Sequence, residues 1–146
     1  MPTTKVALSP YLCVGNAAEA IGFYERAFGA RQTMRIDMPD GRVGHAEIAI
    51  GEVTVMLSDE FPEMGVVSPR TLGGTSVSLY LEVPDADAMT AQAEEAGATV
   101  LRPVELQFYG HRRGDLRDPY GRRWFLSTEV EQVRNEEIER RAREGR

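Results

Sequence analysis

Apolar and polar residues follow the same pattern in two stretches of the chain that start 69 residues apart. Each stretch opens with an alternating segment, passes into an alanine-rich run with apolar residues three and four positions apart, and stops at a glycine. The first stretch starts at Tyr11 and reaches Gly29, and the second starts at Tyr80 and reaches Gly97. A period of this length that occurs only twice indicates a duplicated supersecondary module, because a solenoid needs three or more repeats to bury a core.

The first stretch predicts a strand, a capped helix and three further strands. Val6 and Leu8 begin an alternation that continues to Val14, which is typical of a strand with one apolar face. Asn16 is followed three positions later by Glu19, as in a capping box at a helix N-terminus. The apolar stripe of the helix consists of Ala17, Ala20, Ile21, Tyr24, Ala27 and Phe28. The later strands are expected at residues 31–38, 42–50 and 53–58.

The second stretch predicts the same order of elements. It contains a strand at 75–83, a helix at 86–96 capped by Asp85, and strands at about 99–106, 111–117 and 122–128. Proline and glycine are frequent in residues 59–74, which we expect to link the two halves. We therefore expect one domain with modules at 5–58 and 75–128, a linker at 59–74 and a helical tail at 129–146. The fold class is α+β, with two βαβββ modules forming a cupped mixed sheet.

Composition and charge narrow the function classes. The net charge of −6 over 146 residues argues against a general nucleic-acid-binding protein, which is normally basic. No run approaches the roughly 18 consecutive apolar residues of a membrane helix, so we expect no membrane partner. The N-terminus lacks the apolar core of a signal peptide, and the single Cys13 fits a reducing cytoplasm, where we expect the protein to act.

One face of each predicted sheet packs on its helix, and the other lines a cleft between the modules, because side chains alternate across a strand. In the strand at 42–50, the helix side carries Ala46, Ile48 and Ile50, and the opposite side carries Val43, His45, Glu47 and Ala49. The same alternation gathers Tyr11, His45, Glu47, Tyr80, His111, Arg113 and Asp115 on the cleft side. Phe108, Tyr109 and Trp124 lie nearby in the sequence.

Two interpretations of His45 and Glu47 stay open. A carboxylate on the same face raises the pKa of an imidazole towards neutral, so the two residues form a candidate catalytic acid/base pair. A histidine and a glutamate two positions apart on a half-solvated strand also make an ordinary polar lining that performs no chemistry.

The other candidate residues point to ligand binding. They are Tyr11, Tyr80, Tyr109, His111, Arg113 and Trp124. A tyrosine stacks on a ligand or hydrogen-bonds to it, although tyrosine and tryptophan also fill cores. Arg113 matches a carboxylate or phosphate in a bidentate way, and a solvated strand end is the alternative. The segment from Arg102 to Arg123 contains six arginines and three acids, so it is locally positive within an acidic protein.

Several motifs of the chain match a known family. They are the helix end Phe23-Tyr24-x-x-Ala27-Phe28-Gly29-Ala30 and the turn Asp118-Pro119-Tyr120-Gly121, together with the paired βαβββ modules. With these features the chain resembles the vicinal oxygen chelate superfamily, which joins glyoxalase I, bleomycin-resistance proteins and extradiol dioxygenases. Stretches including Gly44-His45-Ala46-Glu47-Ile48, Glu60-Phe61-Pro62-Glu63 and Gln107-Phe108-Tyr109-Gly110 resemble its glyoxalase-like branch once described as demethylubiquinone methyltransferases.

The resemblance covers about residues 5–140 and has implications for assembly and for metal binding. It implies paired modules that are completed in a homodimer, with ligands held in the clefts. Metal-using members place His or Glu on the first and last strands of each half. The corresponding positions here fall near Ser9, Met56, Ser78 and Phe125. None of these side chains is a good ligand for a divalent ion, so we expect no metal and no other cofactor.

The function that we expect is a metal-free small-molecule-binding protein of the drug-resistance type. Such a protein sequesters an aromatic or polar ligand in the cleft between the modules and lowers its free concentration through affinity alone. The alternative is a metal-dependent lyase, isomerase or dioxygenase of the same superfamily, with His45 and Glu47 as a base or as an unusual metal half-site. A third interpretation is a subunit that interacts through the helix at 129–146, with its cleft filled by side chains.

Overall fold

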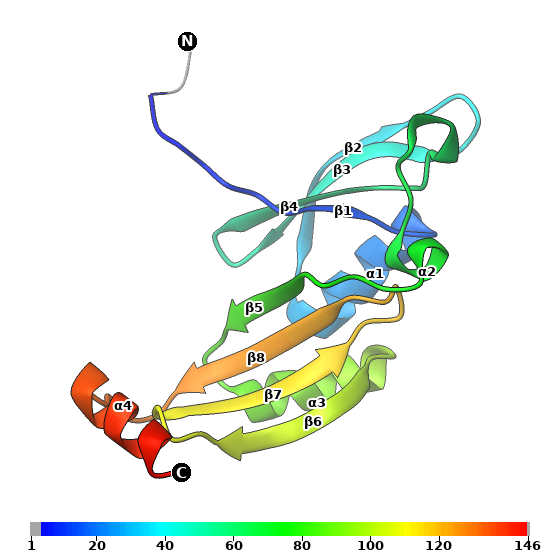
Figure 1. Cartoon of the computed structure of the whole chain (residues 1–146). Coiled ribbons are helices and arrows are strands. Elements are labelled where there is room, and N and C mark those ends of the chain that lie inside the picture. Colours follow the sequence, from blue (N-terminus) through cyan, green and yellow to red (C-terminus); the bar gives the residue numbers. More distant parts are fainter. Residues whose placement is uncertain (1–3, 146) are drawn as a thin grey trace. The chain divides into compact units, whose positions relative to one another are not determined.

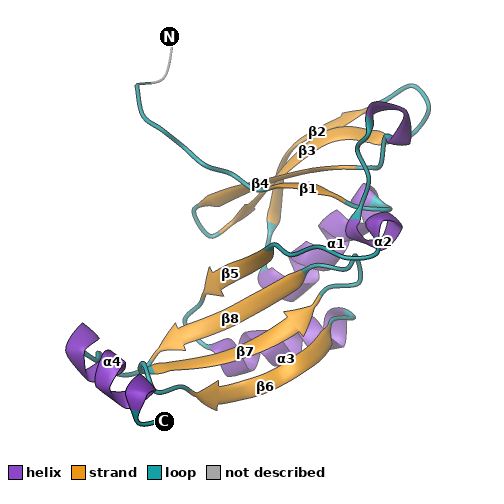
Figure 2. Cartoon of the chain, viewed as in Figure 1, coloured by secondary structure: helices purple, strands orange, loops and turns teal. Residues whose placement is uncertain are grey.

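Each half of the chain folds into a βαβββ module in the computed structural model, as Figure 1 and Figure 2 show. The structure describes residues 4–145, and the chain divides into two compact units between Gly74 and Thr75. The predicted α+β fold of two βαβββ modules is confirmed. No helix within the described residues combines the length and the apolar character needed to span a membrane.

The first module contains one helix and one four-stranded sheet. Its elements are β1 (Tyr11–Cys13), α1 (Ala17–Phe28), β2 (Arg31–Asp37), β3 (Val43–Ile50) and β4 (Val53–Ser58). The strand order is β1-β4-β3-β2, in which β1 runs parallel to β4 and the other pairs are antiparallel. Two short helices follow, η1 (Pro62–Met64) and α2 (Pro69–Leu72).

The second module repeats this arrangement. Its elements are β5 (Ser78–Glu82), α3 (Ala86–Ala96), β6 (Thr99–Leu106), β7 (His111–Arg117) and β8 (Arg123–Glu129). The order β5-β8-β7-β6, with β5 parallel to β8, is that of the first sheet. Helix α4 (Asn135–Arg143) follows β8 within the predicted tail.

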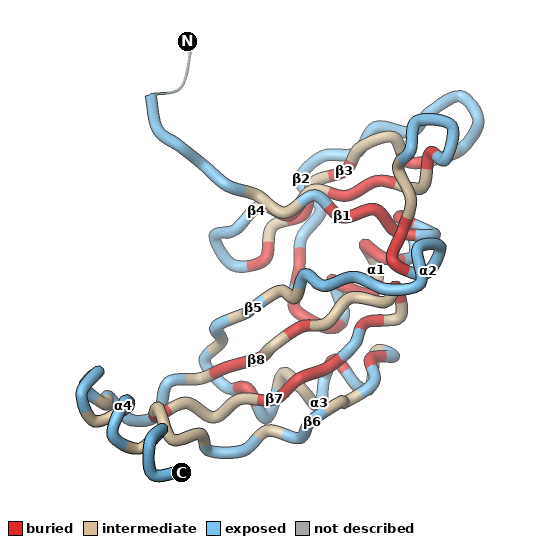
Figure 3. Tube along the Cα trace, in the orientation of Figure 1, coloured by how far each residue is buried: buried red, intermediate tan, exposed pale blue. Residues whose placement is uncertain are grey.

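The predicted helix boundaries follow from the caps. Asn16 Oδ1 accepts the Glu19 N–H at 3.1 Å, and Asp85 Oδ1 accepts the Ala88 N–H at 3.0 Å, so each helix starts at a side-chain cap. Gly29 ends α1 in the left-handed conformation at φ 70°. Buried residues lie where each helix meets its sheet, which leaves the other face of the sheet for a site (Figure 3).

The first strand is shorter than the alternation predicts. Strand β1 starts at Tyr11, and residues 4–10 extend away from the sheet (Figure 1), with Val6 and Leu8 almost fully exposed. Pro10 has no N–H to donate, although its carbonyl accepts the Met56 N–H at 3.0 Å. The pairing with β4 therefore stops at this proline, and the predicted strand from Val6 is corrected to three residues.

The predicted side of Val43 is also corrected. Alternation puts Val43 on the same side as His45, but Val43 is buried at 1% exposure. The pairing of β2 with β3 shifts here, because Ile36 faces His45 while Asp37 faces Val43, which leaves Gly44 without a partner. This β-bulge turns Val43 to the core side without moving His45 from the open side.

Candidate functional site

Three polar side chains form a chain of contacts on the open face of the first sheet. The Tyr11 hydroxyl lies 2.7 Å from His45 Nδ1, and His45 Nε2 lies 2.8 Å from Glu47 Oε2. Strands β1 and β3 bring them together, although Tyr11 and His45 are 34 residues apart in the sequence. The side chains of His45 and Glu47 are about one quarter exposed, whereas Tyr11 is about half exposed, so water reaches the outer end of this series of contacts.

Both contacts of the His45 ring are satisfied together when its proton is on Nε2. In that tautomer Nε2 donates to the Glu47 carboxylate, and Nδ1 accepts a hydrogen bond from the Tyr11 hydroxyl. Burial raises the pKa of Tyr11, so its hydroxyl keeps its proton at neutral pH. The phenol oxygen then still has lone pairs with which to accept a hydrogen bond from a ligand.

Tyr11 and His45 line an apolar hollow of about 480 Å³ within the first module. Its apolar wall consists of Ile36, Met38, Phe61, Met64 and Val66, and its polar part includes Tyr11, His45 and Ser58. A hollow of this size, apolar with a few converging polar groups, is typical of small-molecule sites. We call it the apolar hollow.

Part of this wall comes from the segment that the sequence predicts as a linker. We call residues 60–66 the wall segment. A bridge between Phe61 and Val66 folds it back on itself. Arg42 attaches it to the β2–β3 turn, since its guanidinium donates to both Glu63 carboxylate oxygens at 2.8 and 3.2 Å. The same group lies 4.0 Å from the centre of the Phe61 ring and donates to Asp40, which keeps Arg42 in this position.

The second sheet carries different chemistry at the corresponding positions. In the first sheet, Met56 on β4 pairs with Tyr11 on β1 and with Glu47 on β3. In the second sheet, Phe125 on β8 pairs with Tyr80 on β5 and with Asp115 on β7. The corresponding residues are Tyr11 and Tyr80, His45 and Arg113, Glu47 and Asp115, and Met56 and Phe125. An imidazole in the first module is thus replaced by a guanidinium in the second.

Arg113 and Tyr109 line a second hollow of about 400 Å³ within the second module. We call it the polar hollow, and its other lining residues are Arg102, Pro103, Glu105, Gln107 and Asp115. Arg113 donates to the Tyr109 hydroxyl at 3.4 Å, and its guanidinium lies 4.0 Å from the centre of the Phe125 ring. Of the predicted ligand-binding residues, Tyr11 lines the apolar hollow, and Tyr109 and Arg113 line the polar hollow. Tyr80 is on the open face of the second sheet and lines neither hollow.

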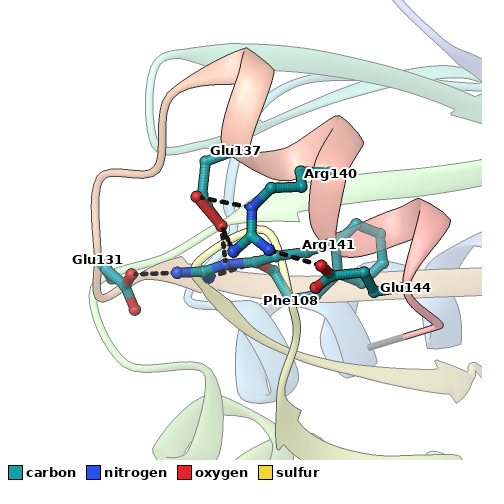
Figure 4. A network of polar contacts seen from close by, with 6 residues as sticks. All are labelled: Phe108, Glu131, Glu137, Arg140, Arg141 and Glu144. Carbon is teal, nitrogen blue, oxygen red and sulfur yellow. Dashed lines mark hydrogen bonds and ion pairs between the residues drawn. The ribbon is translucent and has the colours of Figure 1, made fainter.

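Helix α4 supports the turn that carries Tyr109 (Figure 4). Arg141 donates to the Phe108 carbonyl at 2.8 Å and pairs with Glu131 and Glu137 at 3.3 Å. Gly110, in the same turn, has φ 91°, and a Cβ there would lie 2.2 Å from the Glu131 carbonyl oxygen. The turn and the tail therefore fit closely only with glycine at this position.

Two other predicted site residues have different positions. His111 Nδ1 lies 2.8 Å from Ser127 Oγ and 3.6 Å from Glu82 Oε1, which puts the imidazole on the open face but outside the lining of the polar hollow. Trp124 is only 3% exposed and donates from Nε1 to Asp118 at 2.9 Å. It points to the helix side of the sheet, so Trp124 is corrected from a ligand-binding candidate to a core residue.

The positions that the resemblance assigns to metal ligands do not suit a divalent ion. They are Ser9, Met56, Ser78 and Phe125. Hydroxyl, thioether and phenyl groups are poor ligands for a divalent metal ion compared with imidazole and carboxylate. Among residues 4–145, no three His, Cys, Asp or Glu side chains gather in a way that could hold a metal ion. The two ring nitrogens of His45 lie within hydrogen-bond distance of Tyr11 and Glu47.

Comparisons with known proteins agree with this fold. A sequence model of the Glyoxalase/Bleomycin resistance protein/Dioxygenase superfamily matches residues 6–126. The protein Rv0887c of Mycobacterium tuberculosis is 44% identical over 136 residues, which cover 91% of this chain and 80% of that protein.

Two solved structures show the similarity in three dimensions. PA1353 from Pseudomonas aeruginosa superimposes with a TM-score of 0.70 at 23% identity, covering 87% of this chain and 100% of that one. The fosfomycin resistance protein FosX from Listeria monocytogenes gives a TM-score of 0.66 at 12% identity, covering 94% and 99%. At these identities the likeness concerns the fold alone.

Proposed function

This chain belongs to the glyoxalase/bleomycin resistance protein/dioxygenase superfamily, and within that family we propose that it is a metal-free protein that binds a small molecule in the apolar hollow. The ligand has an apolar, aromatic body and a polar group that hydrogen-bonds to Tyr11. By sequestering such a compound the protein lowers its free concentration, so it needs no turnover.

The observation that carries this proposal is the Tyr11–His45–Glu47 chain at the edge of the apolar hollow. Glu47 orients the imidazole, and the imidazole accepts from Tyr11, so the phenol oxygen is held in one orientation before a ligand arrives. A polar group held in place in this way recognises a ligand with little loss of entropy on binding. The apolar wall supplies the rest of the affinity through burial of ligand surface.

The neutral compound 2-naphthol, which has a two-ring body and one hydroxyl, is a suitable probe. We expect fluorescence titration to show saturable binding, and 2-methoxynaphthalene, which cannot donate, to bind more weakly. Tyr11→Phe removes one neutral hydrogen bond and is expected to weaken 2-naphthol binding about fivefold. Met64→Ser removes an exposed apolar side chain from the wall of the hollow and is expected to weaken 2-naphthol binding about threefold.

Tyr80→Phe is the matched control, because Tyr80 occupies the corresponding position in the other module. Its 2-naphthol affinity is expected to equal that of the wild type. The proposal fails if 2-naphthol does not bind, or if the two tyrosine variants lose the same affinity.

A second candidate is an enzyme in which the same chain moves a proton. Tyr11, His45 and Glu47 form a continuous hydrogen-bonded path, which suits general acid/base chemistry on a ligand in the hollow. If the metal-dependent form of this alternative holds, the purified protein contains a first-row metal at a near-stoichiometric level, and the His45→Ala variant contains none. In the binding-protein proposal, His45→Ala weakens affinity modestly, and metal content stays at background in both proteins.

A further inference from the structure

One buried carboxylate in the second module is surrounded by three guanidinium groups. Asp115 is 4% exposed, and its carboxylate lies 2.7 Å from Arg123, 3.5 Å from Arg113 and 3.8 Å from Arg102. Arg123 makes the closest contact and satisfies much of the charge of the aspartate. Positive charge from the other two arginines therefore exceeds what this carboxylate neutralises.

Arg113 is fixed in position and keeps donors available. Its guanidinium packs on the Phe125 ring at 4.0 Å, its Nε is directed to Asp115, and its Nη1 donates to the Tyr109 hydroxyl. No other residue in the described range 4–145 receives a hydrogen bond from Arg113. The Tyr109 hydroxyl oxygen accepts the hydrogen bond from Arg113, so the hydroxyl proton of Tyr109 can be donated to a ligand.

Both donors open onto the polar hollow of about 400 Å³. Arg102 also lines it, and its side chain is 77% exposed, with the contact to Asp115 as the one ion pair it makes among residues 4–145. Glu105 is the opposing charge, because it lines the same hollow and pairs across the strands with Arg113. The lining itself carries two arginines and two carboxylates. Arg123 pairs with Asp115 from outside the lining and takes up its charge, so the guanidinium groups of the cluster exceed the carboxylates by one.

We propose that the polar hollow binds a small oxyanion, a carboxylate or a phosphate, held by Arg113, Arg102 and the Tyr109 hydroxyl. Arginine matches such anions through parallel N–H···O contacts, and packing on Phe125 lowers the entropy lost on binding. This site goes beyond the proposed function, since it lies in the other module and recognises charge instead of apolar surface. The two modules thus use one scaffold for two kinds of recognition.

Titration of the full chain with sodium phosphate and, separately, with sodium acetate at constant ionic strength tests this proposal. Backbone amide NMR signals report the site directly. We expect saturable shifts at His111–Asp115 for at least one of the two anions. Arg113→Gln removes a charge-assisted contact and is expected to weaken binding about tenfold. Arg112→Gln removes the same charge from the opposite side of β7, where Arg112 pairs with Asp87 at 2.8 Å, and is expected to change affinity less than about twofold.

Glu105→Gln provides a test that does not depend on the stability of the Arg113 variant. It removes the negative charge that opposes an anion, so phosphate affinity is expected to rise about threefold as the local repulsion is lost. The proposal is overturned if neither anion produces saturable shifts, if Arg112→Gln and Arg113→Gln weaken binding equally, or if Glu105→Gln leaves the affinity unchanged. Unaltered 2-naphthol binding in these variants separates this outcome from a failure of the proposed function.

Discussion

Single residues give the apolar hollow its shape as well as its hydrogen-bonding groups. Met38 packs directly over Gly44, so closely that a Cβ on the glycine would lie 2.6 Å from the methionine sulfur. Gly44 is also the residue skipped by the β-bulge that turns Val43 to the core side. The absence of a side chain at Gly44 therefore leaves room for Met38 in the wall of the apolar hollow.

Substitution of this glycine tests its role at the residue scale. In Gly44→Ala the new methyl group displaces the Met38 side chain, which can move because it is about 40% exposed. We expect 2-naphthol affinity to fall severalfold while the free energy of unfolding changes by less than about 1 kcal/mol. Calorimetric titration and chemical denaturation measure the two quantities.

Gly15→Ala is the control, because a Cβ at Gly15 would meet no atom within 4 Å. It is expected to change neither affinity nor stability appreciably. Unchanged affinity in Gly44→Ala would show that Met38 does not shape the binding surface.

At the scale of elements, Arg42 attaches the wall segment to the β2–β3 turn. Arg42 lowers the pKa values of Glu63 and Asp40 by hydrogen bonding to their carboxylates. A carboxyl group with a lowered pKa stabilises the folded arrangement at neutral pH, and this contribution disappears as the pH falls through the lowered pKa. The attachment of the wall segment is therefore expected to weaken in acid.

The pH dependence of binding provides the corresponding prediction. We expect the wild-type affinity for 2-naphthol to fall as the pH drops below about 4, the ordinary pKa of a carboxyl group. Arg42→Gln is expected to bind more weakly already at neutral pH and to lack this further fall in acid. The difference between the two proteins gives the contribution of Arg42 to the pH dependence of binding, because His45 and Glu47 are present in both. Fluorescence titration at several pH values measures it.

Arg35→Gln is the matched variant for this comparison, since Arg35 pairs with Asp37 at 2.9 Å in the same module but outside the hollow. Its pH profile is expected to follow that of the wild type. A parallel loss in Arg35→Gln and Arg42→Gln would mean that net charge, and not attachment of the wall segment, controls binding.

The sequence could not have predicted this wall. Local patterns identify residues 59–74 as a connection because proline and glycine are frequent there. The contact that makes the segment part of the hollow joins Arg42 to Glu63, 21 residues away, and such pairings depend on how the chain folds back. The motif Glu60-Phe61-Pro62-Glu63 was the available signal, but on its own it indicated a family and no position.

At the scale of the whole molecule, the features that follow from a regular spacing of apolar residues or from helix caps could be predicted from the sequence. Capping side chains and the alternation of β3 gave the two modules, the helix ends and the contact of His45 with Glu47. Local exceptions were not predictable, because Pro10 ends the pairing of β1 and the bulge at Gly44 turns Val43 inward. The homodimer and the cleft between the modules stay predictions.

The most direct test of the account is calorimetric titration of 2-naphthol into protein stripped with EDTA, repeated after addition of zinc. Recognition by Tyr11 and the apolar wall requires no ion, so we predict the same affinity in both titrations. Binding that appears only with zinc, or no binding in either titration, would contradict a metal-free site in this hollow.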